Sequence, residues 1–142
     1  MMRKFERLSN IFFGVEMFNG EIDLSQQRER IFFFIVEHTT DKEYIEKQAM
    51  QLLVAGCRYF HFFGAEESLW HLTFDGVDVM MYPNSTPENV ALTFNYITYD
   101  DFVDEIKFCI NCRYFLPTDI YLVYDDKSIY QKVLRALKIY DV

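Results

Sequence analysis

The chain has 142 residues, a length typical of one domain of roughly 100–150 residues. Hydrophobic residues make up 51% and charged residues 25%, a composition that excludes an intrinsically disordered chain. The formal net charge of −8 argues against direct binding to nucleic acid or to an anionic membrane, because both attract cationic surfaces.

The sequence lacks the features of export and of membrane insertion. The basic N-terminus is followed by no long apolar stretch, so we expect no signal peptide. The longest apolar run, Ile31 to Val36, is far shorter than the roughly 20 residues of a membrane span. Three cysteines, an odd number, argue against a disulfide framework. We therefore expect one domain over residues 1–142 in a reducing cytoplasm.

The first 30 residues are the hardest part to interpret. The apolar segment from Ile11 to Phe18 predicts a strand, and the dipeptide Asn19-Gly20 after it favours a tight turn into a second strand over residues 21–24. Both a hairpin at the edge of a sheet and an irregular arm are compatible with residues 1–30.

A β-α-β unit is the clearest pattern in the chain. The run from Ile31 to Val36 has no polar residue, which is typical of a central parallel strand buried on both faces. Residues 38–41 offer capping side chains for a helix that Gly56 ends. The run from Tyr59 to Phe63 then predicts the second strand of the unit, so the crossover should be right-handed.

The rest of the chain continues this alternation. We expect a helix over 66–72, a strand over 77–82, a strand or helix start over 90–96, a helix over 100–110, a strand over 120–124 and a helix over 128–138. Asp75-Gly76-Val77-Asp78 resembles half of a calcium loop without its closing glutamate, so we interpret it as a turn. The predicted fold is an α/β three-layer sandwich, Rossmann-like, with a mainly parallel sheet of four or five strands and helices on both faces.

The patterns that indicate cofactors and metals are weak. The turn after the first central strand, residues 37–41, has no glycine and two acids, so neither a dinucleotide nor a Walker loop is present there. Cys109 and Cys112 fall at the end of a predicted helix instead of at its N-terminus, and we interpret them as structural residues. We therefore assign no catalytic residue, metal or cofactor.

Negative charge is concentrated between residues 75 and 126, which carry ten acidic residues and two basic ones. Tyrosines are interleaved with these acids. This pattern suits a single outward face that binds a basic protein, since carboxylates steer a basic partner and tyrosines supply contact area. A solvated acidic face with tyrosines in the core is the alternative. The candidate partner-binding residues are Asp100, Asp101, Asp104, Glu105, Asp125, Asp126, Tyr99 and Tyr124.

Two resemblances bear on function. Gly56-Cys57-Arg58-Tyr59, Phe63-Gly64, Leu69-Trp70-His71 and Asp75 resemble small uncharacterised bacterial Rossmann-like domains, which implies a fold but no activity. The small, acidic profile without catalytic motifs is similar to bacterial immunity proteins, including those of contact-dependent growth inhibition. Such proteins neutralise a toxin domain, often a basic nuclease, by covering or crowding its active site.

The leading hypothesis is accordingly a non-enzymatic, antitoxin-like protein of the cytoplasm that binds a basic toxin domain through an acidic, tyrosine-rich face. The alternative is a small-ligand-binding or enzymatic domain. Its pocket would lie at the carboxyl ends of the strands, lined by Glu37, His38, Gly64 and Asp125. Assembly of several copies of the chain stays open.

Overall fold

The computed structural model describes residues 2–7, 10–18, 22–25, 29–87, 89–111 and 118–138, with side chains from Phe12 onward. The elements, in chain order, are β1 (Met2–Arg7), β2 (Asn10–Glu16), β3 (Glu29–Ile35), α1 (Lys42–Val54), β4 (Tyr59–Phe63), α2 (Glu67–Met81), β5 (Leu92–Tyr96), α3 (Tyr99–Asn111), β6 (Thr118–Tyr124) and α4 (Lys127–Ala136).

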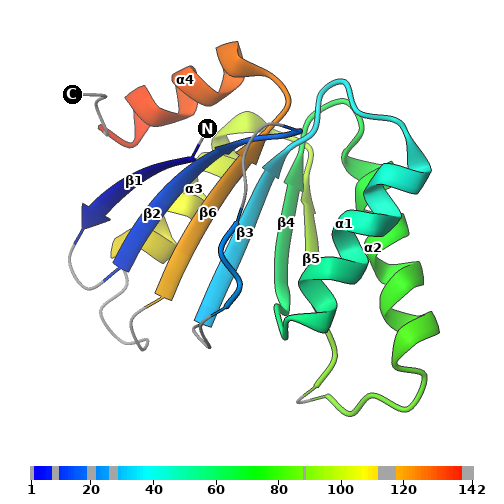
Figure 1. Cartoon of the computed structure of the whole chain (residues 1–142). Helices are drawn as coiled ribbons and strands as arrows, with labels where there is room; N and C mark the ends of the chain where they lie inside the picture. Colours follow the sequence, from blue (N-terminus) through cyan, green and yellow to red (C-terminus); the bar gives the residue numbers. More distant parts are fainter. Residues whose placement is uncertain are drawn as a thin grey trace.

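The strands form one six-stranded sheet in the order β1-β2-β6-β3-β4-β5 (Figure 1). Strand β1 pairs antiparallel with β2, and every other neighbouring pair is parallel. The predicted α/β class with a mainly parallel sheet is confirmed, and the sheet is one or two strands larger than expected. The connection through α3 returns from the edge strand β5 to β6, which lies between β2 and β3.

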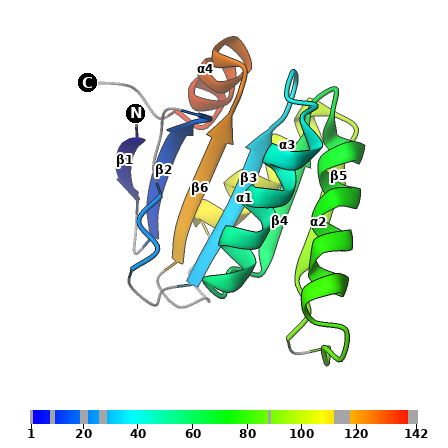
Figure 2. The same ribbon diagram turned by 45° about the vertical axis from the view of Figure 1, so that its right-hand side comes forward.

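The alternation of side chains along β3 divides the molecule into three layers. Phe32 and Phe34 belong to one hydrophobic cluster, whereas Phe33 and Ile35 belong to another. Because successive side chains of a strand point to opposite faces, these clusters lie on the two sides of the sheet. Buried residues of α1 and α2 complete the first cluster, and those of α3 and α4 complete the second. The two helix pairs are seen on their respective sides in Figures 1 and 2.

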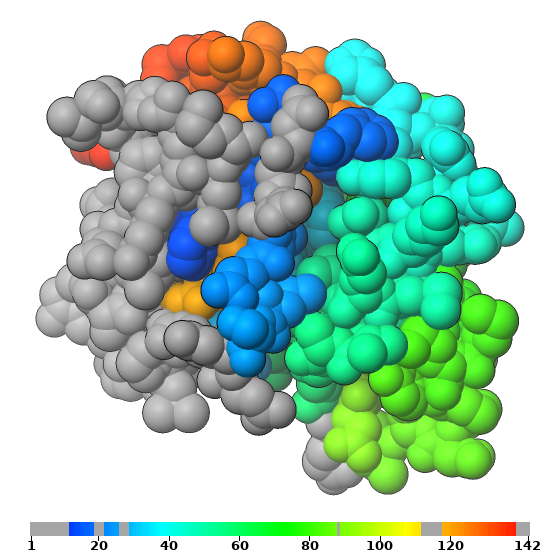
Figure 3. All heavy atoms as spheres, viewed as in Figure 1, coloured from blue at the N-terminus to red at the C-terminus, as the bar shows by residue number. Residues whose placement is uncertain are grey.

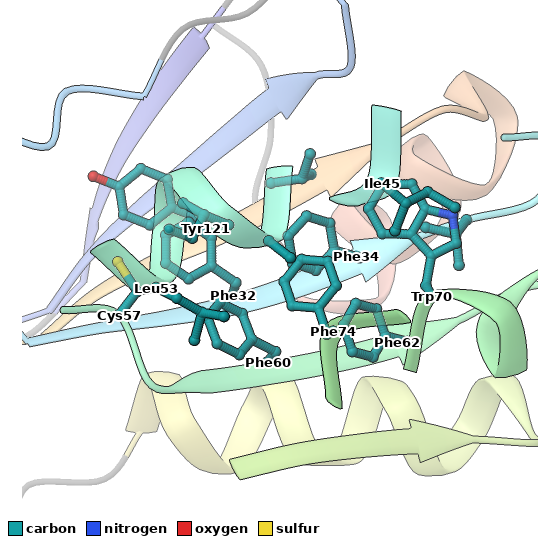
Figure 4. Close-up of a cluster of buried hydrophobic side chains, with 14 of the residues drawn as sticks. Phe32, Phe34, Ile45, Leu53, Cys57, Phe60, Phe62, Trp70, Phe74 and Tyr121 are labelled. Atoms are coloured by element: carbon teal, nitrogen blue, oxygen red, sulfur yellow. The ribbon is translucent and has the colours of Figure 1, made fainter. Parts of the chain in front are cut away.

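Aromatic rings fill the core beneath α1 and α2 (Figure 4). The ring of Phe34 lies 5.3 Å from that of Phe62, 5.4 Å from that of Trp70 and 5.6 Å from that of Phe74. The indole N–H of Trp70 donates to the carbonyl oxygen of Thr39 at 3.0 Å, so its polar atom is satisfied inside the core. In the space-filling view, atoms of α1 and α2 form the surface on this side of the molecule, in cyan and green (Figure 3).

The capping predicted before α1 is confirmed, and α4 begins one residue before the helix expected over 128–138. Asp41 caps α1 by accepting from the backbone N–H of Tyr44, and Asp126 caps α4 by accepting from that of Ile129. Gly56 follows the last turn of α1 with a φ of 87°, a left-handed conformation that favours glycine.

The N-terminal segment pairs differently from the expected hairpin. Strands β1 and β2 pair from Met2 opposite Val15 to Arg7 opposite Asn10, so the chain reverses between them. Strand β2 is not an edge strand, because it also pairs in parallel with β6. The turn expected at Asn19-Gly20 lies outside the described residues, and residues 22–24 form no strand.

The strand expected over Val77–Tyr82 and the turn expected over Asp75–Asp78 are both wrong, since α2 runs unbroken from Glu67 to Met81. Trp70, Phe74 and Val77 are buried at helical spacing, which holds the segment in a helix despite its β-branched residues. None of the described helices has the length and apolar character needed to cross a bilayer.

Two glycine substitutions test this backbone geometry. Ala at Gly76, inside α2 with open space around its Cβ position, should stabilise the protein by about 0.5–1 kcal/mol because alanine favours helix. Ala at Gly64 should destabilise it by about 1–3 kcal/mol, since φ is +126° and the new Cβ would lie 2.6 Å from the carbonyl oxygen of Val36. Urea unfolding measures both, and a loss of stability in Gly76→Ala would contradict the helix.

Candidate functional site

The sheet reverses its direction of winding at the adjacent strands β3 and β6. The chain leaves β3 toward α1 on one face and leaves β6 toward α4 on the other (Figure 1). In open α/β sheets, ligands commonly bind in the crevice outside the carboxyl ends of such strands, because diverging loops leave backbone N–H groups pointing outward. The first candidate site is therefore this carboxyl edge.

The carboxylate of Asp125 lies at this edge and accepts hydrogen bonds from the loop after β3. Its Oδ1 accepts from the backbone N–H of Glu37 at 2.8 Å, and its Oδ2 from those of His38 at 2.9 Å and Thr39 at 2.8 Å. The hydroxyl of Thr39 donates to the same Oδ2 at 2.7 Å. The loop after β3 thus forms an anion-binding cradle, and the chain fills it with its own side chain.

The other residues of the predicted strand-end pocket are drawn together in the same way. Glu37 Oε2 accepts from the backbone N–H of Ala65 at 2.9 Å. The N–H of Glu66 donates to the carbonyl oxygen of Val36 at 2.9 Å, and Gly64 packs closely against the same carbonyl group. The structure brings the predicted pocket residues to one place, but their polar groups largely bond one another.

His38, which is exposed, and Asp126, which is half-buried, form a pair at this edge. His38 Nε2 lies 2.9 Å from Asp126 Oδ2, while Asp126 Oδ1 caps α4. The bond to Asp126 raises the pKa of His38 above its ordinary value of 6.5. The backbone N–H of Ile129, followed by His38, lowers the pKa of Asp126. His38 thus contacts the residue that caps the N-terminus of α4.

The expected single acidic face is wrong, because the carboxylates of residues 75–126 lie on both sides of the sheet. Asp75 and Asp78 belong to α2, where Asp75 accepts from the hydroxyl of Thr93 and Asp78 is buried. Asp119 is buried within β6, and Glu88 lies outside the described residues. Asp78 and Asp119 are buried and therefore offer little charge to a partner.

The predicted partner-binding residues separate into a set on α3 and a set at the carboxyl end of β6. On α3, Asp100, Asp101 and Asp104 are exposed and Glu105 is half-buried. Tyr99 is half-buried against α4: its hydroxyl donates to the carbonyl of Lys132 at 3.2 Å, and the Lys132 ammonium lies 4.2 Å from its ring centre. The set at the carboxyl end of β6 consists of Tyr124, which is buried and stacks on Tyr130 at 3.9 Å, and of Asp125 and Asp126, which are half-buried.

A second candidate site lies on the α3 side of the sheet and was not predicted from the sequence. A groove of about 450 Å³ runs between the second half of α3 and the first halves of the strands; we call it the α3 groove. It is lined by Glu29, Ile31, Tyr59, His61, Leu92, Phe94, Glu105, Phe108, Cys109 and Thr118. Its apolar side chains are incompletely covered, since Phe108 is 59% exposed.

His61 is the polar centre of the α3 groove. Its ring stacks between Phe33 at 4.3 Å and Phe94 at 4.9 Å, and its Nδ1 lies 2.8 Å from the hydroxyl of Tyr96. Burial lowers the pKa of His61 to about 4, so the ring is neutral at pH 7. The sequence placed His61 in a strand. It could not predict the groove, because the groove forms only where α3 packs beside that strand.

The cysteines do not assemble a metal site within the described residues. Cys57 belongs to the core beneath α1 and α2, whereas Cys109 packs against the core on the α3 side. Burial raises the pKa of the Cys57 thiol, which makes it a poor nucleophile. No group of three or more candidate ligands occurs in the described part of the chain, and Cys112 lies outside it.

Comparison of the chain with protein-family models, with curated proteins and with solved structures finds no match. The geometry of the two candidate sites is therefore the basis for a functional proposal.

Replacing Asp125 tests the cradle. Asp125→Gly should lower the free energy of unfolding by about 2–4 kcal/mol, because it removes the acceptor of three backbone N–H groups. Inorganic phosphate should recover part of this loss by occupying the vacated cradle, whereas the same ionic strength of chloride should not. Equal effects of the two salts would contradict an anion cradle.

The His38 pair predicts a pH dependence. In an NMR titration, Asp126→Asn should lower the pKa of His38 toward 6.5 while asparagine still caps α4. The pair stabilises the fold at pH values below the ordinary histidine pKa, and this contribution is lost as the pH rises through the raised pKa of His38. An unchanged His38 pKa in the variant would show that the contact does not persist in solution.

Proposed function

We propose that this chain is a non-enzymatic, antitoxin-like immunity protein that binds and neutralises a basic toxin domain, in particular a nuclease. The contact surface in this proposal is the exposed side of α3. Its carboxylates take the place of the phosphates that a nuclease would bind, so the toxin's own basic site attracts its inhibitor.

The observation that carries the proposal is the state of the α3 carboxylates. Asp100, Asp101 and Asp104 are exposed, and none of them forms an ion pair with a described residue. The helix carries four acidic residues against one lysine. Clustered carboxylates that remain un-neutralised raise the association rate with a basic protein, and the net charge of −8 adds to that field.

Apolar side chains beside these carboxylates support a contact surface over a merely solvated face. Ile97, just before α3, is 89% exposed, and Phe108 in its second half is 59% exposed. Protein interfaces commonly combine apolar anchors with a charged rim that steers encounter. The α3 side offers both over a single helix.

The strand-end pocket has less support as a functional site. The N–H groups that would hold a ligand at that edge already donate to Asp125, and Glu37 is bonded to the loop after β4. Asp125 and Asp126 therefore contribute to the acidic field in this proposal but not to direct contact.

Matched charge reversals test the location of the contact. The pair Asp101→Lys and Asp104→Lys should slow association with the basic partner about tenfold at low salt and flatten its salt dependence. The pair Glu43→Lys and Glu46→Lys has the same spacing and charge change on α1, and it should have a much smaller effect. Stopped-flow association rates give the comparison, and equal slowing by both pairs would contradict an α3 interface.

The partner itself is sought in the reading frame beside the gene. Expression of the C-terminal domain encoded there should arrest growth, and co-expression of this chain should restore it. Growth arrest that persists with the chain present, or a neighbour that is not toxic, would count against the immunity function.

A further inference from the structure

The α3 groove has the size and lining of a small-molecule site. Its volume of about 450 Å³ falls within the range of roughly 300–1,000 Å³ that such sites occupy. Stacked rings of Phe33, His61 and Phe94 run across three neighbouring strands on this face. Leu92 and Phe108 border them and are partly exposed. A flat apolar body would cover these side chains and remove them from water.

The charge around the groove selects the sign of such a ligand. Glu105 and Glu29 line it, and no lysine or arginine does so among the described residues. The neutral ring of His61 supplies no positive charge. Carboxylates beside apolar walls interact more strongly with a cation than they would in open water, and they repel an anion.

His61 also offers a hydrogen-bonding atom to a ligand. Its Nδ1 is engaged with the hydroxyl of Tyr96, whereas no described group bonds its Nε2. A side chain buried to 95% and lining the groove is held in one orientation by the stack on both of its faces. The groove therefore combines apolar walls with one fixed polar group and a carboxylate, the usual composition of a specific site.

The hollow on the other face of the sheet lacks these features. It is larger, about 570 Å³, and lies between the ends of α1 and α2. Its charged side chains are already engaged, because Arg58 donates to the carbonyl of Val90 and Asp78 accepts from the N–H of Ala91. Nothing in its lining selects a ligand of one charge.

We propose that the α3 groove binds a small aromatic amine, with its ring against Phe94 and Phe108 and its ammonium group at the carboxylate of Glu105. This ligand is additional to the proposed protein partner, although the two share Phe108, which lines the groove and is part of the proposed contact surface. It would give the chain a ligand of its own on the side of the molecule that carries the acidic helix.

A pair of isosteric probes tests the proposal with the whole chain. Tryptamine and indole-3-propionate share an indole and a two-carbon arm but end in an ammonium and a carboxylate. Titration followed by NMR of the Leu92 methyl groups and the His61 ring should show saturable binding of tryptamine. We expect indole-3-propionate to bind at least about tenfold more weakly, a difference of about 1.4 kcal/mol.

Two neighbouring variants on α3 distinguish binding at the groove from general attraction of a cation to the acidic helix. Glu105→Gln should weaken tryptamine binding about tenfold, whereas Asp104→Asn, one residue earlier and outside the groove, should leave it nearly unchanged. Amide spectra of both variants establish that they are folded. Equal binding of the two probes, equal effects of the two variants, or no saturable shift of Leu92 and His61 would overturn the proposal.

Discussion

The bond between Asp125 and the loop after β3 is the interaction on which the arrangement of the molecule depends. Adjacent parallel strands that send their helices to opposite faces leave a gap between their outgoing loops. Here a single carboxylate spans that gap by accepting three backbone N–H groups and one hydroxyl. The loops on both sides of the sheet are thereby held by a side chain of the protein itself, and for this reason our proposals place function on the flank of α3 instead of at the strand ends.

Helix electrostatics explains much of the acidic composition without invoking a partner. Each described helix follows a parallel strand, so all four begin at the same edge and present the positive ends of their dipoles there. Asp41 and Asp126 are caps, and Glu67, Asp100 and Asp101 lie in first turns. Asp104 and Glu105 lie beyond the first turn of α3, where the dipole does not require them. These two acids are therefore the more informative ones about function.

The sequence pattern predicted an element correctly wherever the burial of its residues matched their intrinsic preference for helix or strand. The uninterrupted run of β3 and the capped helix after it were predictable, because both follow from neighbouring residues. The second half of α2 was not, since Val77, Val79 and Met80 suit a strand until Trp70 and Phe74 are seen to bury a helical face. Tertiary packing decided this segment over intrinsic propensity.

The candidate sites depended on contacts that no local pattern contains. Asp125 was predicted to be near Glu37 and His38 because strand ends of a parallel sheet share an edge, but its role as an internal acceptor requires coordinates. The α3 groove exists because the chain crosses back from β5 to β6, placing Glu105 over His61 and Phe94. The charge pattern of the sequence identified the acids of α3. It could not distinguish them from Asp75 and Asp78 of α2, which accept hydrogen bonds from other parts of the fold.

We propose that function lies on the α3 flank and not at the closed strand ends. A chemical-shift map of the ¹⁵N-labelled chain in complex with its toxin partner tests this most directly. We expect the perturbed amides to concentrate in residues 97–108, while the amides of residues 37–39, which Asp125 holds in place, keep their chemical shifts. Perturbation centred on residues 37–39 with α3 unaffected would contradict it.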